Sequence, residues 1–135
     1  MDSNDVLKVF IVDDDVFFGK LIQRQLEILE NINITFFDNA LDFLDALTDK
    51  PDIVVLDYKI PVRNGIQLME AVKKKHPETK VIILSGQDSL NVVVEAYDQG
   101  ADRYLIKADT ALVELKHSIQ RLRNTLTLKV DFRSV

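Results

Sequence analysis

The stretch FIVDDD, residues 10–15, decides how the rest of the chain is interpreted. An apolar run that is typical of a buried strand ends here in three consecutive carboxylates. Two like charges about 4 Å apart repel each other by roughly 4 kcal/mol at an effective dielectric constant near 20. Solvent exposure, capping of a following helix or a bound cation could offset this repulsion, and the remaining sequence has to distinguish among them.

Composition indicates one small globular domain. The chain has 135 residues, of which 47% are hydrophobic, and this is enough for one compact core. The absence of cysteine excludes disulfides and thiolate metal sites and favours a cytoplasmic location. A net charge of -5 argues against direct nucleic-acid binding. The first residues lack the positive charges of a signal peptide, and no apolar run is long enough to span a membrane, so we expect no membrane association.

Short apolar runs alternate with stretches of helical periodicity along the whole chain. The runs predicted as strands are residues 6–12, 33–37, 52–57, 81–86 and 102–107. Between and after them, apolar residues recur at helix spacing: Phe18, Leu21, Ile22, Leu26 and Leu29; Leu41, Leu44 and Leu47; Ile66, Met69 and Val72; Leu90, Val93 and Tyr97; and Leu112, Leu115, Ile119, Leu122 and Leu126. The strands are nearly continuous in apolar residues, as expected for strands that are buried on both faces.

This alternation predicts an α/β fold with a doubly wound, five-stranded parallel sheet and helices on both faces. We place one domain at residues 1–126 and a C-terminal tail or truncated linker at residues 127–135. Residues 125–135 fit no further helix in this interpretation.

Polar residues follow four of the five predicted strands. Asp13 and Asp14 follow the first, and Asp57, Ser85 and Lys107 end the third, fourth and fifth. The ligand site of an open parallel α/β sheet lies beyond the carboxyl ends of its strands, so these side chains should converge. Three carboxylates together favour a hard divalent cation with oxygen ligands, and Mg²⁺ is the cofactor that we predict.

Four segments in register carry a resemblance to a known family. VDDD (12–15), LDYKIPVRNG (56–65), LSG (84–86) and GADRYLIK (100–107) resemble the receiver domain of two-component response regulators, over about residues 6–126. The resemblance implies a flavodoxin-like sheet with strand order 2-1-3-4-5. It also implies a cytoplasmic phosphoprotein that receives a phosphoryl group from a sensor histidine kinase or phosphotransfer protein in a phosphorelay.

The resemblance also implies a role for each of the site residues. Asp57 would be the phosphoacceptor and a metal ligand. Asp14 would ligate Mg²⁺ directly, Asp13 mainly through water, and Lys59 through its backbone carbonyl. Lys107 would pair with Asp57 and later with a phosphoryl oxygen.

Two residues would convert phosphorylation into a signal. Ser85 would donate its hydroxyl to the phosphoryl group and move toward it, and Tyr104 would rotate inward to fill the vacated space. The readout surface would be the fourth helix, fifth strand and fifth helix, facing an unknown output protein or domain. We also consider a homodimer through the fifth helix.

Two departures from the family pattern bear on these expectations. Ala108 follows Lys107 where the family usually has proline, and a cis bond before a non-proline residue costs about 2.5–4 kcal/mol. We therefore expect a rerouted or mobile loop there. Lys59 stands two residues after Asp57, and we hypothesise that it alters the lifetime of the phosphorylated state together with Gln87.

Other interpretations remain open at this point. Asp15 is interpreted as a helix cap or first-turn residue. A phosphorylation-independent pseudo-receiver that acts as an interaction domain is the main alternative. A Mg²⁺-dependent phosphohydrolase would want a second acid where Lys59 stands, and a dinucleotide binder would want a glycine-rich turn in place of the acids. We expect no enzymatic activity beyond self-catalysed phosphoryl transfer and slow autodephosphorylation.

Overall fold

The computed structural model of the protein describes residues 6–86 and 89–134. In this part of the chain five strands alternate with five helices, and the predicted strands agree with the observed ones to within one residue at each end. The elements are β1 (Leu7–Val12), α1 (Val16–Leu26), β2 (Ile32–Phe37), α2 (Ala40–Ala46), β3 (Ile53–Asp57), α3 (Gly65–Lys75), β4 (Lys80–Ser85), α4 (Leu90–Asp98), β5 (Arg103–Ile106) and α5 (Ala111–Ser134).

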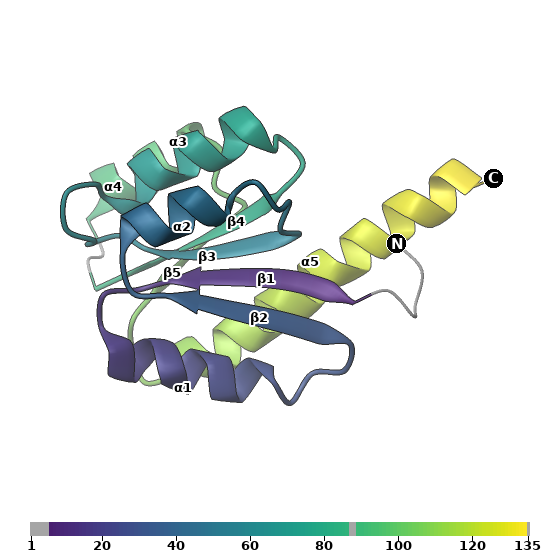
Figure 1. Cartoon of the computed structure of the whole chain (residues 1–135), viewed down its shortest axis with the longest axis horizontal. Coiled ribbons are helices and arrows are strands. Elements are labelled where there is room, and N and C mark those ends of the chain that lie inside the picture. Colours follow the sequence, from purple (N-terminus) through teal and green to yellow (C-terminus); the bar gives the residue numbers. More distant parts are fainter. Residues whose placement is uncertain (1–5, 87–88, 135) are drawn as a thin grey trace.

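The strands form one parallel sheet in the order β2-β1-β3-β4-β5. Helices α1 and α5 cover one face, and α2, α3 and α4 cover the other (Figure 1). The predicted α/β class, the double winding and the strand order 2-1-3-4-5 are therefore confirmed. Because the strand order reverses direction at β1, the carboxyl ends of β1 and β3 lie next to each other although the whole of α1, β2 and α2 separates them in the sequence.

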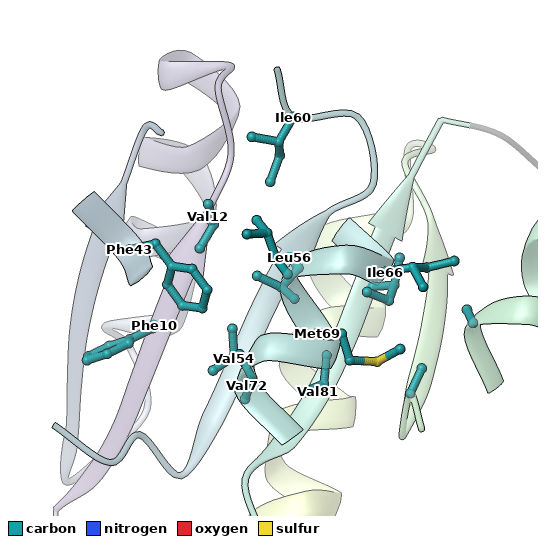
Figure 2. Close-up of a cluster of buried hydrophobic side chains, with 14 of the residues drawn as sticks. Phe10, Val12, Phe43, Val54, Leu56, Ile60, Ile66, Met69, Val72 and Val81 are labelled. Atoms are coloured by element: carbon teal, nitrogen blue, oxygen red, sulfur yellow. The ribbon is translucent and has the colours of Figure 1, made fainter. Parts of the chain in front are cut away.

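Successive strand residues point to opposite faces and fill two separate cores. Val9 and Ile11 of β1 pack with α1 and α5, whereas Phe10 and Val12 pack with α2, α3 and α4. Figure 2 shows the second cluster, in which Phe43 of α2 lies beside Phe10. The Phe10 and Phe43 ring centroids are 6.4 Å apart in an edge-to-face arrangement. Burial on both faces is the physical reason why the strands are continuously apolar.

The C-terminal helix is longer than the sequence analysis expected. The expectation that residues 125–135 form no helix is wrong for residues 125–134, because α5 continues to Ser134. Residues 111–134 contain no glycine or proline, so a helix that has already formed can be extended at little cost. In Figure 1 α5 extends past the edge of the sheet where the strands begin. The domain boundary at residue 126 stays a prediction.

None of the helices in the described ranges, α5 included, combines the length and apolarity needed to cross a membrane. The predicted site residues lie at the edge of the sheet where the strands end, away from the C-terminal end of α5 (Figure 1).

Candidate functional site

The three acids after β1 have three different environments. The Asp13 side chain is almost completely buried, and its Oδ1 accepts a hydrogen bond from the backbone N–H of Asp15 at 2.9 Å. The Asp14 side chain is exposed to solvent. Asp15 caps α1, because its side chain accepts a hydrogen bond from the backbone N–H of Phe18 at 3.1 Å. The interpretation of Asp15 as a helix cap is confirmed.

Asp57 is the last residue of β3 and is 6% exposed. Its backbone is in close contact with the beginning of α3, where Gly65 donates its N–H to the carbonyl of Tyr58 at 2.8 Å. A Cβ atom at Gly65 would lie 2.6 Å from the Asp57 carbonyl oxygen, so only glycine fits there without movement. The α3 capping box of Asn64 and Gln67 fixes the same turn. The backbone that holds Asp57 is thus closely packed.

The three carboxylates that the sequence analysis expected to converge lie close together. One oxygen from each of Asp13, Asp14 and Asp57 lies within 4.8 Å of the other two. Two of these side chains are buried and one faces solvent, which leaves an open side for ligands from solution. Carboxylate oxygens are the ligands that Mg²⁺ prefers, and Mg²⁺ usually takes one or two of them together with water and phosphate. The donor set fits this ion.

Lys107 lies directly after β5 and brings a positive charge to the carboxylates. Its Nζ is 2.9 Å from Asp13 Oδ2 and 3.4 Å from Asp57 Oδ2. The predicted pairing with Asp57 is present, but the shorter contact is with Asp13, which sequence reasoning did not anticipate. The same Nζ lies 4.6 Å from the centroid of the Phe18 ring. Helical periodicity had suggested only a core position for Phe18.

The electrostatic balance of the site favours binding of a further cation. Burial, followed by the negative charge of Asp13, raises the pKa of Asp57 from 3.8 to about 7, and Lys107 only partly opposes this shift. Burial lowers the pKa of Lys107, but the hydrogen bond and charge of Asp13, together with Asp57, outweigh burial and hold that pKa above 10.5. One lysine therefore does not neutralise the buried carboxylates, and a divalent cation would favour the ionised form of Asp57.

The predicted switch residues lie on neighbouring strands. Ser85 is fully buried at the end of β4, and its carbonyl accepts a hydrogen bond from the backbone N–H of Lys107 at 2.8 Å. Tyr104 of β5 is 9% exposed and packs in the core beneath α4. Its backbone N–H donates to the Tyr97 hydroxyl at 3.1 Å, a contact with α4 that sequence reasoning missed. The ring of Tyr104 is thus already buried in this structure.

The departures from the family pattern lie around the edge of the site. Lys59 is exposed and lines an open hollow together with Asp14 and Asn64. The Lys107–Ala108 peptide bond is trans, so the cis bond that would contradict the expectation is not found. The rerouted or mobile loop itself stays a prediction. Gln87 lies outside the described residues.

Comparison with known proteins identifies the family. The family model for the response regulator receiver domain matches residues 9–120. The sheet order and the acidic cluster after β1 and β3 agree with this match. The chain belongs to the response regulator receiver domain family.

Relatives and solved structures agree with this assignment. The chain is 36% identical over 100 residues to the DNA-binding transcriptional regulator NtrC of Escherichia coli strain K12, covering 73% of this chain and 21% of NtrC. It is 30% identical over 115 residues to the luminescence regulatory protein LuxO of Vibrio campbellii, covering 82% of this chain and 25% of LuxO. The receiver domain of the Francisella response regulator 1452 superposes with a TM-score of 0.80 at 30% identity, over 89% of this chain and 98% of that one. The chain thus spans about a quarter or less of these two curated relatives.

The raised pKa of Asp57 predicts an unusual dependence of stability on pH. Because the folded pKa of about 7 lies above the unfolded value of 3.8, the folded protein holds the proton more tightly, and this contribution to stability is lost as pH rises through that window. In metal-free protein at pH 8, Asp57→Asn should increase the free energy of unfolding by roughly 1–3 kcal/mol, since the amide removes a buried charge beside Asp13. Urea unfolding in the presence of a chelator measures this gain.

The gain should shrink as pH falls from 7 toward 4, where the wild-type carboxyl group also becomes neutral. Asp14→Asn is the matched control and should produce a smaller gain, because Asp14 is exposed. An Asp57→Asn variant that is less stable than wild type at pH 8, or whose gain does not depend on pH, would contradict this account of the site.

Proposed function

We propose that this chain is a phosphorylation-switched receiver module of a two-component system, which accepts a phosphoryl group on Asp57. The observation that carries the proposal is the meeting of Asp13, Asp14 and Asp57 beside Lys107 at one edge of the sheet. The donor would be the phosphohistidine of a sensor histidine kinase or of a phosphotransfer protein. A cytoplasmic location, expected from the sequence, is part of the same proposal.

The chemistry needs an ionised nucleophile and neutralisation of charge. A carboxylate oxygen of Asp57 attacks the phosphorus atom, the bond between phosphorus and the donor nitrogen breaks, and its electron pair stays on the imidazole. Mg²⁺, held by Asp14, Asp57, the Lys59 carbonyl and, through water, Asp13, would supply positive charge for the phosphoryl oxygens. Lys107 is positioned to pair with another phosphoryl oxygen. Hydrolysis of the acyl phosphate would return Asp57 slowly to its free state, with no other enzymatic activity.

The phosphorylated protein would signal through the surface formed by α4, β5 and α5. Leu90, Val94 and Tyr97 of α4 and Val113 of α5 are large apolar side chains that are about half or more exposed. An output protein or domain, or a second copy of the chain, could cover them. Among the relatives, the printed name of NtrC describes a DNA-binding regulator. A DNA-binding output would therefore lie in another part of a longer protein or in a partner, because the net charge of -5 disfavours binding by this chain.

The pseudo-receiver alternative is less well supported. It would need no charge neutralisation at the strand ends, yet the chain keeps the buried pair Asp13 and Asp57 together with Lys107. Buried like charges destabilise a fold, so their presence favours a function that uses them.

Incubation with Mg²⁺ and acetyl phosphate tests the proposal most simply. Wild type should gain the mass of one phosphoryl group in intact mass spectrometry, and Asp57→Asn should gain none. Asp45→Asn, which changes an exposed carboxylate on α2, is the matched control and should be phosphorylated like wild type. Wild type without an adduct, or an adduct that survives in Asp57→Asn, would refute the assignment of Asp57.

Lys59 provides a second prediction. Its ammonium group, two residues after Asp57, would attract phosphoryl oxygens and obstruct the attacking water. Lys59→Ala should therefore shorten the lifetime of the phosphorylated state by roughly two- to fivefold, the effect expected of one exposed charge contact. The decay of the adduct after removal of acetyl phosphate measures this lifetime, alone and combined with Gln87→Ala. If the phosphoryl adduct decays at the same rate in Lys59→Ala and in wild type, the hypothesis is refuted.

The switch involves Ser85 and Tyr104. A phosphoryl group on Asp57 would draw the Ser85 hydroxyl toward it, and the Tyr104 ring would fill the space that is left. Since the ring is buried in this structure, the proposal requires the unphosphorylated protein to populate a second, outward rotamer. Crystal structures with and without beryllofluoride should differ in the Tyr104 rotamer. The same rotamer in both states would show that this switch does not operate here.

A further inference from the structure

The ring of Phe18 packs against the Lys107 ammonium group at the site. The Lys107 Nζ atom lies 4.6 Å from the ring centroid, and the same atom contacts Asp13 Oδ2 at 2.9 Å and Asp57 Oδ2 at 3.4 Å. A lysine ammonium has three N–H donors. Two carboxylates and one aromatic face therefore match the number of its donors, and each of them is attractive to a cation.

The contact is partly shielded from water. The Lys107 side chain is 20% exposed, and Phe18 is partly buried and packs against the core cluster between the sheet, α1 and α5. Attraction between an ammonium group and an aromatic face strengthens when both are desolvated. A branched aliphatic side chain could fill the same space but would offer no negative face.

The chain segment before α1 links the ring to the carboxylate. The Asp15 N–H donates to Asp13 Oδ1 at 2.9 Å, and Asp15 Oδ1 in turn accepts from the Phe18 N–H at 3.1 Å. Asp13 and Phe18 therefore belong to one hydrogen-bonded turn, and α1 begins at the edge of the sheet where the strands end (Figure 1). This turn presents a carboxylate and an aromatic face to the same ammonium group.

A second lysine–aromatic pair, between α1 and strand β2, provides a contrast. The Nζ of Lys20 lies 5.4 Å from the centroid of the Phe36 ring, but Lys20 is exposed and comes from α1 itself. Such a pair is ordinary at a surface. The pair of Phe18 and Lys107 differs because its lysine comes from the other end of the chain and contacts Asp57.

We propose that Phe18 is a positioning residue, whose aromatic face holds the Lys107 ammonium group against Asp13 and Asp57 for phosphoryl transfer. This inference rests on the proposed function, in which Lys107 pairs with a phosphoryl oxygen. Without the ring, the lysine side chain gains rotamers that turn its charge to solvent, and the fraction of molecules ready to react falls.

A double-mutant cycle on stability tests the contact without using phosphorylation. The variants are Phe18→Leu, Lys107→Met and the double substitution, and urea unfolding gives the equilibrium constant of each. If the ring holds the ammonium, the two substitutions should be coupled by a factor of about two- to fivefold. Phe17→Leu, on the same helix turn but with a 75% exposed side chain, should show no coupling to Lys107→Met. Additive effects of Phe18→Leu and Lys107→Met would overturn the proposal.

The same variants then test the role in phosphoryl transfer. The initial rate of phosphorylation by acetyl phosphate should fall about five- to tenfold in Phe18→Leu, should be retained in Phe18→Tyr, and should be unchanged in Phe17→Leu. In the Lys107→Met background, Phe18→Leu should have no further effect, because the ring acts through the lysine. Equal slowing in both backgrounds would mean that Phe18 only supports the fold, and would overturn the proposal.

The two measurements separate this inference from the proposed function. If wild type takes up no phosphate while the unfolding cycle shows coupling, the proposed function fails, and the contact of Phe18 with Lys107 is purely structural. If wild type is phosphorylated but Phe18→Leu reacts at the wild-type rate, the proposed function stands and the positioning role fails.

Discussion

The carboxylates of Asp13 and Asp57 lie side by side at the ends of adjacent strands, and ionising both of them costs free energy. The rest of the site is arranged around this constraint. Asp13 and Asp57 are buried, and loss of solvation, followed by repulsion from the charge of Asp13, raises the pKa of Asp57 to about 7. Lys107 offsets only part of this cost. A site with unbalanced negative charge, open to solvent at Asp14, is suited to recruit a cation and, with it, an anionic phosphoryl group.

The sheet creates this constraint through its topology. Because β1 lies between β2 and β3, the strand ends that carry Asp13 and Asp57 become neighbours, and β5 delivers Lys107 from beyond β4. The two apolar cores fix the strands on both faces, and the close approach of Gly65 fixes the backbone around Asp57. The strand order and the apolar packing on both faces thus place the charged residues side by side. Such preorganisation lowers the cost of positioning at the moment of reaction.

Much of this could be predicted from sequence, for reasons that differ between residues. Burial on both faces makes strands continuously apolar, which is why strand positions and the convergence of Asp13, Asp14 and Asp57 were predictable. The strand order depended on family resemblance, because periodicity does not specify which strands are neighbours. The length of α5 was missed, since a helix that extends past its sheet needs no apolar stripe. The contact between Phe18 and Lys107 was also missed, because an aromatic residue at helix spacing has the same pattern whether it packs on aliphatic groups or on a cation.

The central claim is that these carboxylates share one divalent cation, and anomalous diffraction from crystals soaked with Mn²⁺ tests it most directly. Mn²⁺ accepts the same oxygen ligands as Mg²⁺ and is visible by its anomalous signal. The account predicts an anomalous peak at coordination distance, roughly 2.0–2.3 Å, from oxygen atoms of both Asp14 and Asp57. A well-ordered site without a peak between these carboxylates, at a Mn²⁺ concentration that saturates other acidic sites in the crystal, would contradict it.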